Sequence, residues 1–363
     1  MQHTLDSIHN TLAQGIVLNE HPLYLELGPC SIAIRSNSPA LLKKLQHYFS
    51  HIVNEAVDNP TIEVLVYERE ATDLGLKYID WARESGKQGR KDAYFDIPEG
   101  RVIYKVRTGV VFVQSSRYRI AAGPCNENDN QVINFMNTQY MSWLQHQGAF
   151  ICHAAALVKG SRCLAMAGLS GGGKSTLMLK LMEDKQVNYI TNDRLLLMPE
   201  DTLPRAIGIP KLPRINPGTI IFNPTLQEMI PAQRRAQLMQ LPRQKLWDLE
   251  EKYDVFIDEL YGPGRITLDA PLNTFLVLNW QHDSQSELEV FKVDISARPD
   301  LLGAIMKAPS AFHQYADGSL YQQQTPLDEP AYINALKGVK VYEARGRVDF
   351  ERLTAYCEDK LLS

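Results

Sequence analysis

The sequence predicts an α/β protein of two domains, a small α/β domain over residues 1–130 and a larger one over residues 131–363. The chain has 363 residues, which is more than one average domain contains. Short apolar runs with a period of two alternate with helical patterns along both parts. Near the middle, a glycine-rich loop stands between a short apolar strand and a helix, an arrangement typical of α/β sheets.

The elements of the first domain follow from alternation and turn signals. The run 23–27 alternates leucine with Tyr and Glu, which indicates a half-buried strand. Ser38-Pro39 supplies an N-cap followed by proline at the first helical position. Two β-rich runs over residues 101–114 flank a turn and predict a hairpin. A polar cluster at 125–130 and a helix over 132–147 then place the domain boundary within residues 125–148. Nothing in this part points to catalysis.

Composition and charge exclude several classes of function. Hydrophobic residues make up 44% of the chain and charged residues 22%, as in ordinary globular proteins. The 38 Lys and Arg residues and the 42 Asp and Glu residues give a net charge of −4, which offers no general attraction for nucleic acid or an anionic membrane. The first residues lack a secretory signal, no apolar run suits a membrane helix, and the five cysteines are scattered. We therefore expect a soluble, cytoplasmic protein.

The strongest chemical signal is the segment Gly168-Leu169-Ser170-Gly171-Gly172-Gly173-Lys174-Ser175, which matches the pattern GxxxxGK[ST]. Glycines let backbone N–H groups surround phosphate oxygens, and the following helix adds its partial positive charge. We expect Lys174 to reach the β- and γ-phosphates of ATP and the Ser175 hydroxyl to ligate Mg²⁺. The nucleotide-binding residues expected on this ground are Gly168, Ser170, Gly171, Gly172, Gly173, Lys174, Ser175 and Thr176.

Two carboxylates compete for the role of Mg²⁺ ligand, because phosphate-loop proteins place an Asp at the end of a neighbouring strand. Asp193 ends the β-rich run 187–193, which follows the helix after the loop. Asp258 lies in Val255-Phe256-Ile257-Asp258-Glu259, where an ATPase would use Glu259 to polarise a water. Spacing alone does not separate the two carboxylates.

Besides the glycine loop, four segments of the larger domain carry a resemblance to a known protein family. They are His153-Ala154-Ala155-Ala156-Leu157-Val158, Thr191-Asn192-Asp193-Arg194, Arg205-Ala206-Ile207-Gly208-Ile209 and Gly262-Pro263-Gly264-Arg265. With the glycine loop, they resemble the catalytic domain of HPr kinase/phosphorylase, and more closely the branch called HprK-related kinase B. The resemblance covers about residues 148–280. It implies a P-loop kinase domain of the HPr kinase catalytic-domain type, with a small N-terminal α/β domain of unknown role.

The resemblance also implies roles for single residues. Asp193 becomes the Mg²⁺ carboxylate together with Ser175, and Asp258 becomes a strand residue before the Arg265 loop. His153 is placed beside the transferring phosphate. Arg265 is expected to neutralise charge on the phosphoryl oxygens. The catalytic residues expected on this basis are His153, Asp193, Arg265 and Asn192.

Three positions depart from the family pattern and reduce the number of acidic groups. Asn192 stands where the family has the Asp taken as the base for the acceptor hydroxyl, and an amide can only orient that hydroxyl. Leu203 replaces a Glu, and Leu169 replaces an Asp of the loop. With these acidic groups lost, either one Asp both ligates Mg²⁺ and acts as the base, or the acceptor is different. The same losses weaken the case for phosphorolysis.

The functional hypothesis is an ATP-dependent kinase that transfers the γ-phosphate to a hydroxyl, on a Ser or Thr of a small partner protein. The resemblance also associates this branch with an ATP-grasp partner and leaves a homo-oligomer open. Three alternatives stay open. They are a small-molecule kinase acting on free serine or a similar hydroxyl, an ATP-binding sensor without transfer, and an ATPase that uses Asp258 and Glu259.

Overall fold

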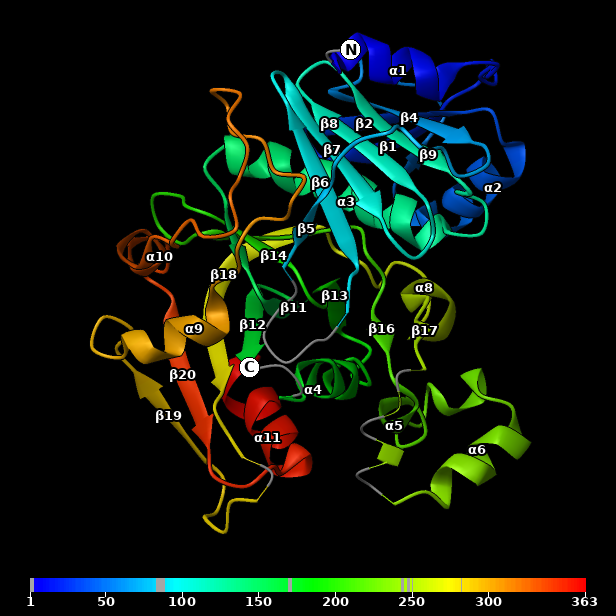
Figure 1. Cartoon of the computed structure of the whole chain (residues 1–363). Helices are drawn as coiled ribbons and strands as arrows, with labels where there is room; N and C mark the ends of the chain where they lie inside the picture. Colours follow the sequence, from blue (N-terminus) through cyan, green and yellow to red (C-terminus); the bar gives the residue numbers. More distant parts are fainter. Residues whose placement is uncertain are drawn as a thin grey trace. The chain divides into compact units, whose positions relative to one another are not determined.

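In a computed structural model of the chain, residues 3–82, 89–168, 172–242, 245–246, 249, 251–281 and 283–363 are described. The chain divides into two compact units (Figure 1). The first comprises Met1–Gln147 and Pro309–Pro326, and the second comprises Gly148–Ala308 and Leu327–Ser363. The division between Gln147 and Gly148 lies at the late end of the expected boundary range 125–148 and after residue 130. The helix before residue 147 and the segment 309–326 both belong to the first unit.

The first unit is built on one mixed sheet, whose strand order over the described residues is β3-β1-β2-β4-β9-β8-β7-β6-β5. The strands are β1 (Leu23–Leu27), β2 (Cys30–Ser36), β3 (Val53–Asn54), β4 (Ile62–Glu68), β5 (Ile79–Trp81), β6 (Asp92–Ile97), β7 (Gly100–Lys105), β8 (Val111–Ser115) and β9 (Arg119–Gly123). The helices are α1 (Leu5–Ala13), α2 (Pro39–Tyr48) and α3 (Asp129–His146), with a short 3₁₀ turn, η1 (Ser50–Ile52).

Local sequence signals account for these elements. The leucines of β1 are buried while Glu26 is exposed, as the alternation predicts. The Ser38 side chain accepts a hydrogen bond from the Leu41 N–H and caps α2. The predicted hairpin is β7–β8. Helices α1 and α3 lie on opposite faces of the sheet (Figure 1). Helix α1 packs against one face, and on the other Phe135 of α3 contacts Phe112 of β8.

A buried arginine ties the segment 309–326 to this sheet. Arg101 of β7 has no exposed surface, and it donates hydrogen bonds to the carbonyls of Ala311 and Tyr321 at 3.1 and 3.0 Å. Its other nitrogens donate to the carboxylate of Asp96, and its guanidinium lies 4.5 Å from the ring centroid of Tyr94. Arg101 therefore provides a polar anchor that brings a distant part of the chain into the first unit.

A pH dependence of stability follows from His313 in the same segment. The residue is 3% exposed, and its Nδ1 lies 3.1 Å from the Ser142 hydroxyl. Burial and the nearby charge of His146 lower the pKa of His313 to about 4. The unfolded histidine, with a pKa of about 6.5, binds a proton between these values while the folded one does not, so the free energy of unfolding falls as the pH falls through this range.

We expect the free energy of unfolding to decrease by about 2 kcal/mol between pH 7 and pH 5 through this group. Urea unfolding at the two pH values measures the decrease, and His313→Gln is expected to remove most of it. His21→Gln, at an exposed histidine of the same unit, serves as the control and should behave as the wild type. Equal pH dependence in wild type and His313→Gln would contradict this assignment.

The second unit contains a branched sheet, in which β18 pairs with β12 along one edge and with β15 and then β20 along the other. Its strands are β10 (Phe150–Cys152), β11 (Ala154–Lys159), β12 (Arg162–Gly168), β13 (Val187–Thr191), β14 (Leu195–Met198), β15 (Arg205–Gly208), β18 (Asp269–Leu278), β19 (Glu289–Val293) and β20 (Lys340–Arg345). A separate pair is formed by β16 (Arg214–Ile215) and β17 (Tyr253–Asp254).

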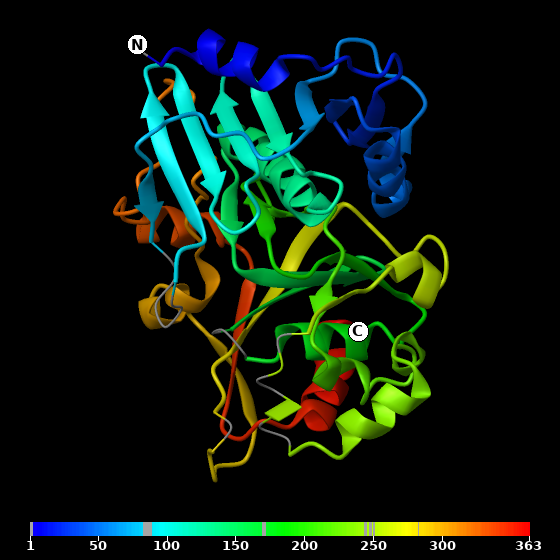
Figure 2. The ribbon, with the colours of Figure 1, turned by 45° about the vertical axis from the view of Figure 1, so that its right-hand side comes forward.

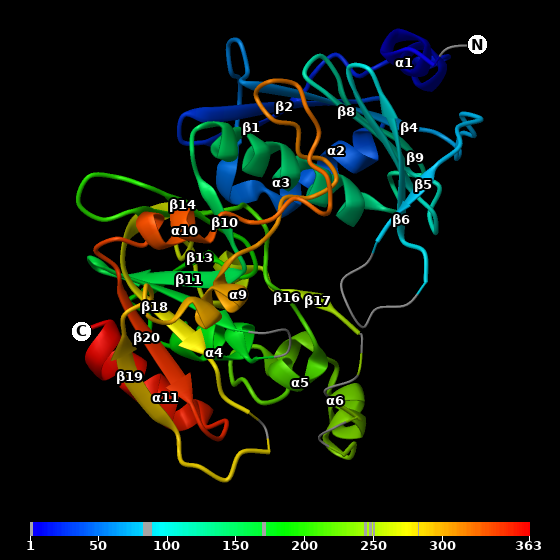
Figure 3. The same ribbon diagram turned by 60° about the vertical axis from the view of Figure 1, so that its left-hand side comes forward.

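Helices cover both faces of this sheet. They are α4 (Lys174–Leu181), α5 (Pro217–Ile220), α6 (Ala232–Met239), α8 (Ile257–Leu260), α9 (Leu302–Ile305), α10 (Glu329–Ala335) and α11 (Phe350–Tyr356), with short turns η2 (Gln227–Met229), η3 (Pro299–Leu301) and η4 (Cys357–Leu361). The side chains of α4 and α11 pack on one face, and α11 lies beside α4 (Figure 2). Helices α9 and α10 cover the other face (Figure 3), where their side chains join a second apolar cluster.

The α/β class expected from the sequence is confirmed. The strand expected at 163–167 is β12, the helix expected after the glycine loop is α4, and the strand expected at 187–193 is β13. Within the part of the chain that the structure describes, no helix combines the length and the apolar character needed to cross a membrane.

Candidate functional site

The candidate site lies at the carboxyl edge of three parallel strands in the second unit. Gly168 at the end of β12 pairs with Leu278 of β18, and Leu278 pairs with Ala344 of β20. In α/β sheets, ligands bind outside the carboxyl ends of parallel strands. The glycine-rich segment therefore begins where the architecture favours a binding site.

The described part of this segment connects β12 to helix α4. Gly173 has a φ of +83°, a left-handed conformation that favours glycine, and α4 begins at Lys174. The first N–H groups of any helix lack an intrahelical partner, so this end of α4 carries partial positive charge. Of the expected phosphate-binding residues, Ser170 and Gly171 lie outside the described residues, as does Leu169.

Lys174 points back toward the start of the loop. Its side-chain nitrogen donates a 2.9 Å hydrogen bond to the Gly168 carbonyl, and the residue is 9% exposed. Burial lowers its pKa, Asp193 acts in the opposite direction, and the charges of Arg194 and Lys307 lower it further. A buried cation in this position strongly favours an anionic ligand that would replace the carbonyl.

The two hydroxyls after Lys174 differ in their contacts. The Thr176 hydroxyl lies 3.0 Å from the hydroxyl of Thr219, which follows Pro217 in α5. The half-buried Ser175 hydroxyl has no hydrogen-bond partner among the described residues. Ser175 is therefore available as a ligand, whereas Thr176 already has a partner.

Strand register brings His153 and Asp193 together at the same edge. The pairing of β11 with β12 sets His153, one residue before β11, level with Gly168. The pairing of β13 with β11 brings Asp193, two residues past the end of β13, to about the same level. Nε2 of His153 lies 3.3 Å from Oδ1 of Asp193. The backbone N–H of His153 donates a 2.7 Å hydrogen bond to the Ile305 carbonyl.

Positive groups surround the Asp193 carboxylate. Arg194 donates to Oδ2 at 2.6 Å. Burial by itself raises the pKa of Asp193, but the hydrogen bond from His153 and the charges of Arg194 and Lys211 outweigh it and hold the pKa well below its usual range. The carboxylate, with 42% of its side chain exposed, is therefore ionised at neutral pH.

Asn192 lies next to Asp193 and presents an unsatisfied acceptor. Its side-chain oxygen is buried and has no hydrogen-bond partner within the described residues. Buried polar atoms without partners are rare, and a ligand donor or an ordered water would satisfy this one. Asn192 can therefore accept a hydrogen bond from a ligand hydroxyl, but it cannot take its proton.

Arg265 is placed differently from the expectation. Its side-chain nitrogens donate to four backbone carbonyls, at distances of 2.6–3.0 Å, and the residue is 8% exposed. The acceptors are the carbonyls of Met182, Asp184, Val187 and Tyr261. Met182 and Val187 mark the end of α4 and the start of β13, while the glycine loop and Asp193 lie at their other ends. The structure therefore does not bring Arg265 to the loop.

Asp258 is also placed differently. The expected strand at 255–259 is absent, because Ile257–Leu260 forms the short helix α8. The Asp258 carboxylate accepts a 3.0 Å hydrogen bond from the Arg265 N–H and thereby fixes the turn between them. The β-strand context on which the ATPase alternative depends is therefore not found, and Asp193 is the carboxylate that faces the loop.

Sequence reasoning did not identify Lys211 or Trp280 as site residues. Lys211, three residues beyond β15, interacts with Asp193, and burial lowers the pKa of Lys211. Trp280, two residues beyond β18, donates a 2.9 Å hydrogen bond to the Gly172 carbonyl. Trp280 stands at the end of an apolar run, which is a signal for the end of a strand. The sequence does not show that this strand pairs with β12, because the two strands are far apart along the chain.

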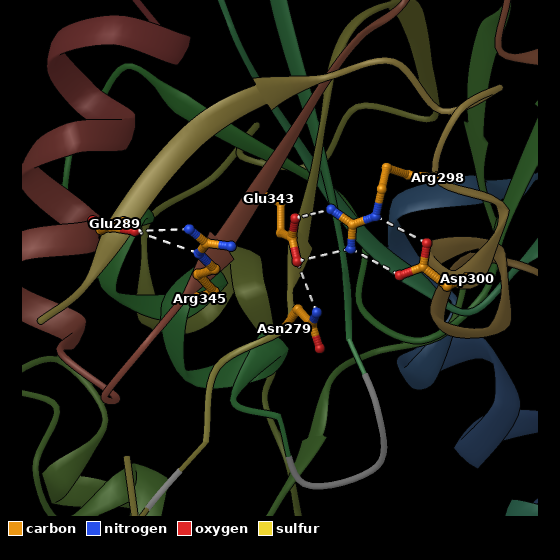
Figure 4. Close-up of polar contacts among 6 residues, drawn as sticks. All are labelled: Asn279, Glu289, Arg298, Asp300, Glu343 and Arg345. Carbon is orange, nitrogen blue, oxygen red and sulfur yellow. Dashed lines mark hydrogen bonds and ion pairs between the residues drawn. The ribbon is translucent and has the colours of Figure 1, made fainter. Parts of the chain in front are cut away.

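A second carboxylate at this edge, Glu343 of β20, is fully paired (Figure 4). The residue is 1% exposed, and it accepts a hydrogen bond from Asn279 at 2.7 Å and two from Arg298. Arg298 also pairs with Asp300, while Arg345 pairs separately with Glu289. Glu343 is therefore a buried carboxylate whose charge the partly exposed Arg298 neutralises, whereas Asp193 is partly exposed.

Comparison with known proteins gives little further information. No family model and no curated protein matches the chain. Among solved structures, the chain is similar to the Hpr(Ser) kinase/phosphatase from Coxiella burnetii, with a TM-score of 0.30 and 11% identity. That likeness covers 58% of this chain and 94% of the other. It is a weak likeness, so the interpretation of the site depends on its own residues.

Proposed function

We propose that the chain is a kinase that binds Mg·ATP at the loop 168–175 and transfers the γ-phosphate to a hydroxyl, on a Ser or Thr of a small partner protein. The observation that supports this proposal is the convergence of Lys174, Asp193 and His153 at the end of a glycine-rich loop. A cation, an ionised carboxylate and a histidine at one loop provide phosphate binding, metal ligation and proton transfer.

Phosphate binding would use the backbone and Lys174. The N–H of Gly173 and those of the first turn of α4 would donate to phosphate oxygens. The Lys174 ammonium would leave the Gly168 carbonyl for the β- and γ-phosphates, exchanging a neutral acceptor for a charged one. In a loose transition state for phosphoryl transfer, catalysis of this kind consists mainly of positioning and charge stabilisation.

The residues at the loop fit a magnesium ion. Asp193 is ionised and partly exposed, its oxygens retain lone pairs beyond the contacts to His153 and Arg194, and the Ser175 hydroxyl has no described partner. Among the described residues, no cluster of three or more His, Cys, Asp or Glu side chains forms a metal site, so phosphates and waters would complete the shell. Bound Mg²⁺ supplies neutralisation of phosphate charge.

His153 would act as the base for the acceptor hydroxyl. In this role, the Nε2–H of His153 would donate to the Asp193 carboxylate, and Nδ1, which has no partner among the described residues, would be the acceptor. The low pKa of Asp193 makes this carboxylate a weak base. The hydroxyl proton would therefore pass to Nδ1, while the buried oxygen of Asn192 orients the incoming group.

The test is transfer of label from γ-labelled Mg·ATP in a clarified lysate of the source cell, with wild type, Asp193→Ala and Lys174→Ala side by side. A discrete labelled protein seen only with wild type would support the kinase and identify its acceptor. Label in a metabolite would favour the small-molecule alternative. If nucleotide binds and no label is transferred, the kinase proposal fails and the chain is an ATP sensor, as Asn192 in place of an acidic base would favour.

A further inference from the structure

We infer that Trp280 is a positioning residue of the glycine loop, which aims the Gly173 N–H at a bound phosphate; this inference rests on the proposed nucleotide site. Trp280 follows β18, the parallel neighbour of β12, so the indole and the loop arise from adjacent strand ends. The indole Nε1 donates to the Gly172 carbonyl at 2.9 Å, and Trp280 is 8% exposed. A buried indole N–H needs such a partner, and here the partner is the loop itself.

The direction of the Gly173 N–H follows from the peptide geometry. A trans peptide is planar, so the carbonyl of Gly172 and the N–H of Gly173 point in opposite directions. Because the indole holds the carbonyl, the N–H points away from Trp280, and it has no hydrogen-bond partner among the described residues. Accepting a hydrogen bond at the carbonyl also polarises the peptide and strengthens the N–H as a donor.

An aromatic ring from the C-terminal part of the chain supports the same peptide. Phe350, the first residue of α11, packs edge-to-face on Trp280 with ring centroids 5.0 Å apart. A Cβ placed on Gly173 would lie 2.6 Å from Cζ of Phe350 and 3.4 Å from the indole Cζ2. The two rings therefore contact the backbone closely on one side of the peptide, and a phosphate would approach from the other.

Trp280→Phe tests this inference, because phenylalanine keeps an aromatic ring and loses the N–H donor. We expect the Kd for MgADP, measured by calorimetry, to rise about two- to tenfold, the effect of one neutral hydrogen bond. Trp143→Phe, at a helix of the first unit, is the matched control and should bind as the wild type does. A role in stability alone would lower the melting temperature of Trp280→Phe and leave the Kd unchanged.

A spectroscopic measurement covers the case in which Trp280→Phe does not fold. In the variant Trp81→Phe, Trp143→Phe, Trp247→Phe, the remaining indole is Trp280, since the chain has four tryptophans. Its emission is expected to change on addition of MgADP and to stay constant when Lys174→Ala is added. Constant emission in a triple variant that binds MgADP would overturn the inference.

The two proposals fail in different ways. If wild type binds no MgADP, the nucleotide site itself is wrong, and the role of Trp280 fails with it. If wild type binds MgADP and Trp280→Phe binds it equally well, only the role of Trp280 is wrong.

Discussion

Lys174→Ala is expected to lower kcat/KM for ATP by about two to three orders of magnitude, because in the proposed function it removes the charged donor for the transferring phosphate. The buried ammonium, now bonded to the Gly168 carbonyl, has a lowered pKa and gains most from a charged partner. Steady-state phosphotransfer to the acceptor that the labelling experiment identifies measures the loss, and calorimetry with MgADP measures the accompanying weakening of binding.

Lys185→Ala provides the matched control for Lys174, since Lys185 is exposed and lies beyond the other end of α4. It should leave kcat/KM within twofold of the wild type. Asp193→Asn keeps the shape of the side chain and removes its charge, so it should affect kcat more than the affinity for ADP. Turnover by Lys174→Ala at the wild-type rate would show that the chemistry lies elsewhere.

Arg265→Lys is expected to lower the free energy of unfolding by about 2–4 kcal/mol. The guanidinium serves four carbonyls in a buried position, and the three donors of a lysine ammonium, held on one atom, cannot reach the same set. Denaturant unfolding measures the loss, with Arg205→Lys at a more exposed arginine as the control. Phosphotransfer by the folded fraction is expected to stay within twofold of the wild type.

The opposite result for Arg265→Lys would restore the role that the family resemblance implies. A variant that is as stable as the wild type but transfers no phosphate would place Arg265 at the phosphoryl group in the working enzyme. The two measurements together therefore decide between a structural and a catalytic arginine.

The sequence predicted the local elements well, because their signals are local. Alternation gave β1, the cap at Ser38 gave α2, and the glycine pattern located the start of α4. The proximity of His153 to Asp193 also follows from short-range pairing, since β11, β12 and β13 are consecutive strands. Their roles in catalysis stay predictions.

The features that sequence reasoning missed depend on partners far along the chain. The guanidinium of Arg265 donates hydrogen bonds to backbone carbonyls that lie about 80 residues earlier in the chain. The tryptophan at 280 reaches a glycine 108 residues away. Asp258 was misread because an apolar run of three residues, Val255–Ile257, is compatible with the start of a short helix as well as with a strand. Tertiary packing decides whether such a run forms a helix or a strand and which distant groups pair, and a single sequence does not contain that information.

The anchoring of residues 309–326 by Arg101 has a consequence for synthesis on the ribosome. Most domains fold as they emerge, but the first unit here lacks part of its structure until Pro326 has been added. During that interval Phe112 and Phe135 lack their ring contacts with Phe312. The nascent chain therefore exposes an incomplete apolar surface while residues 148–308 of the second unit are translated, and such a surface favours chaperone binding.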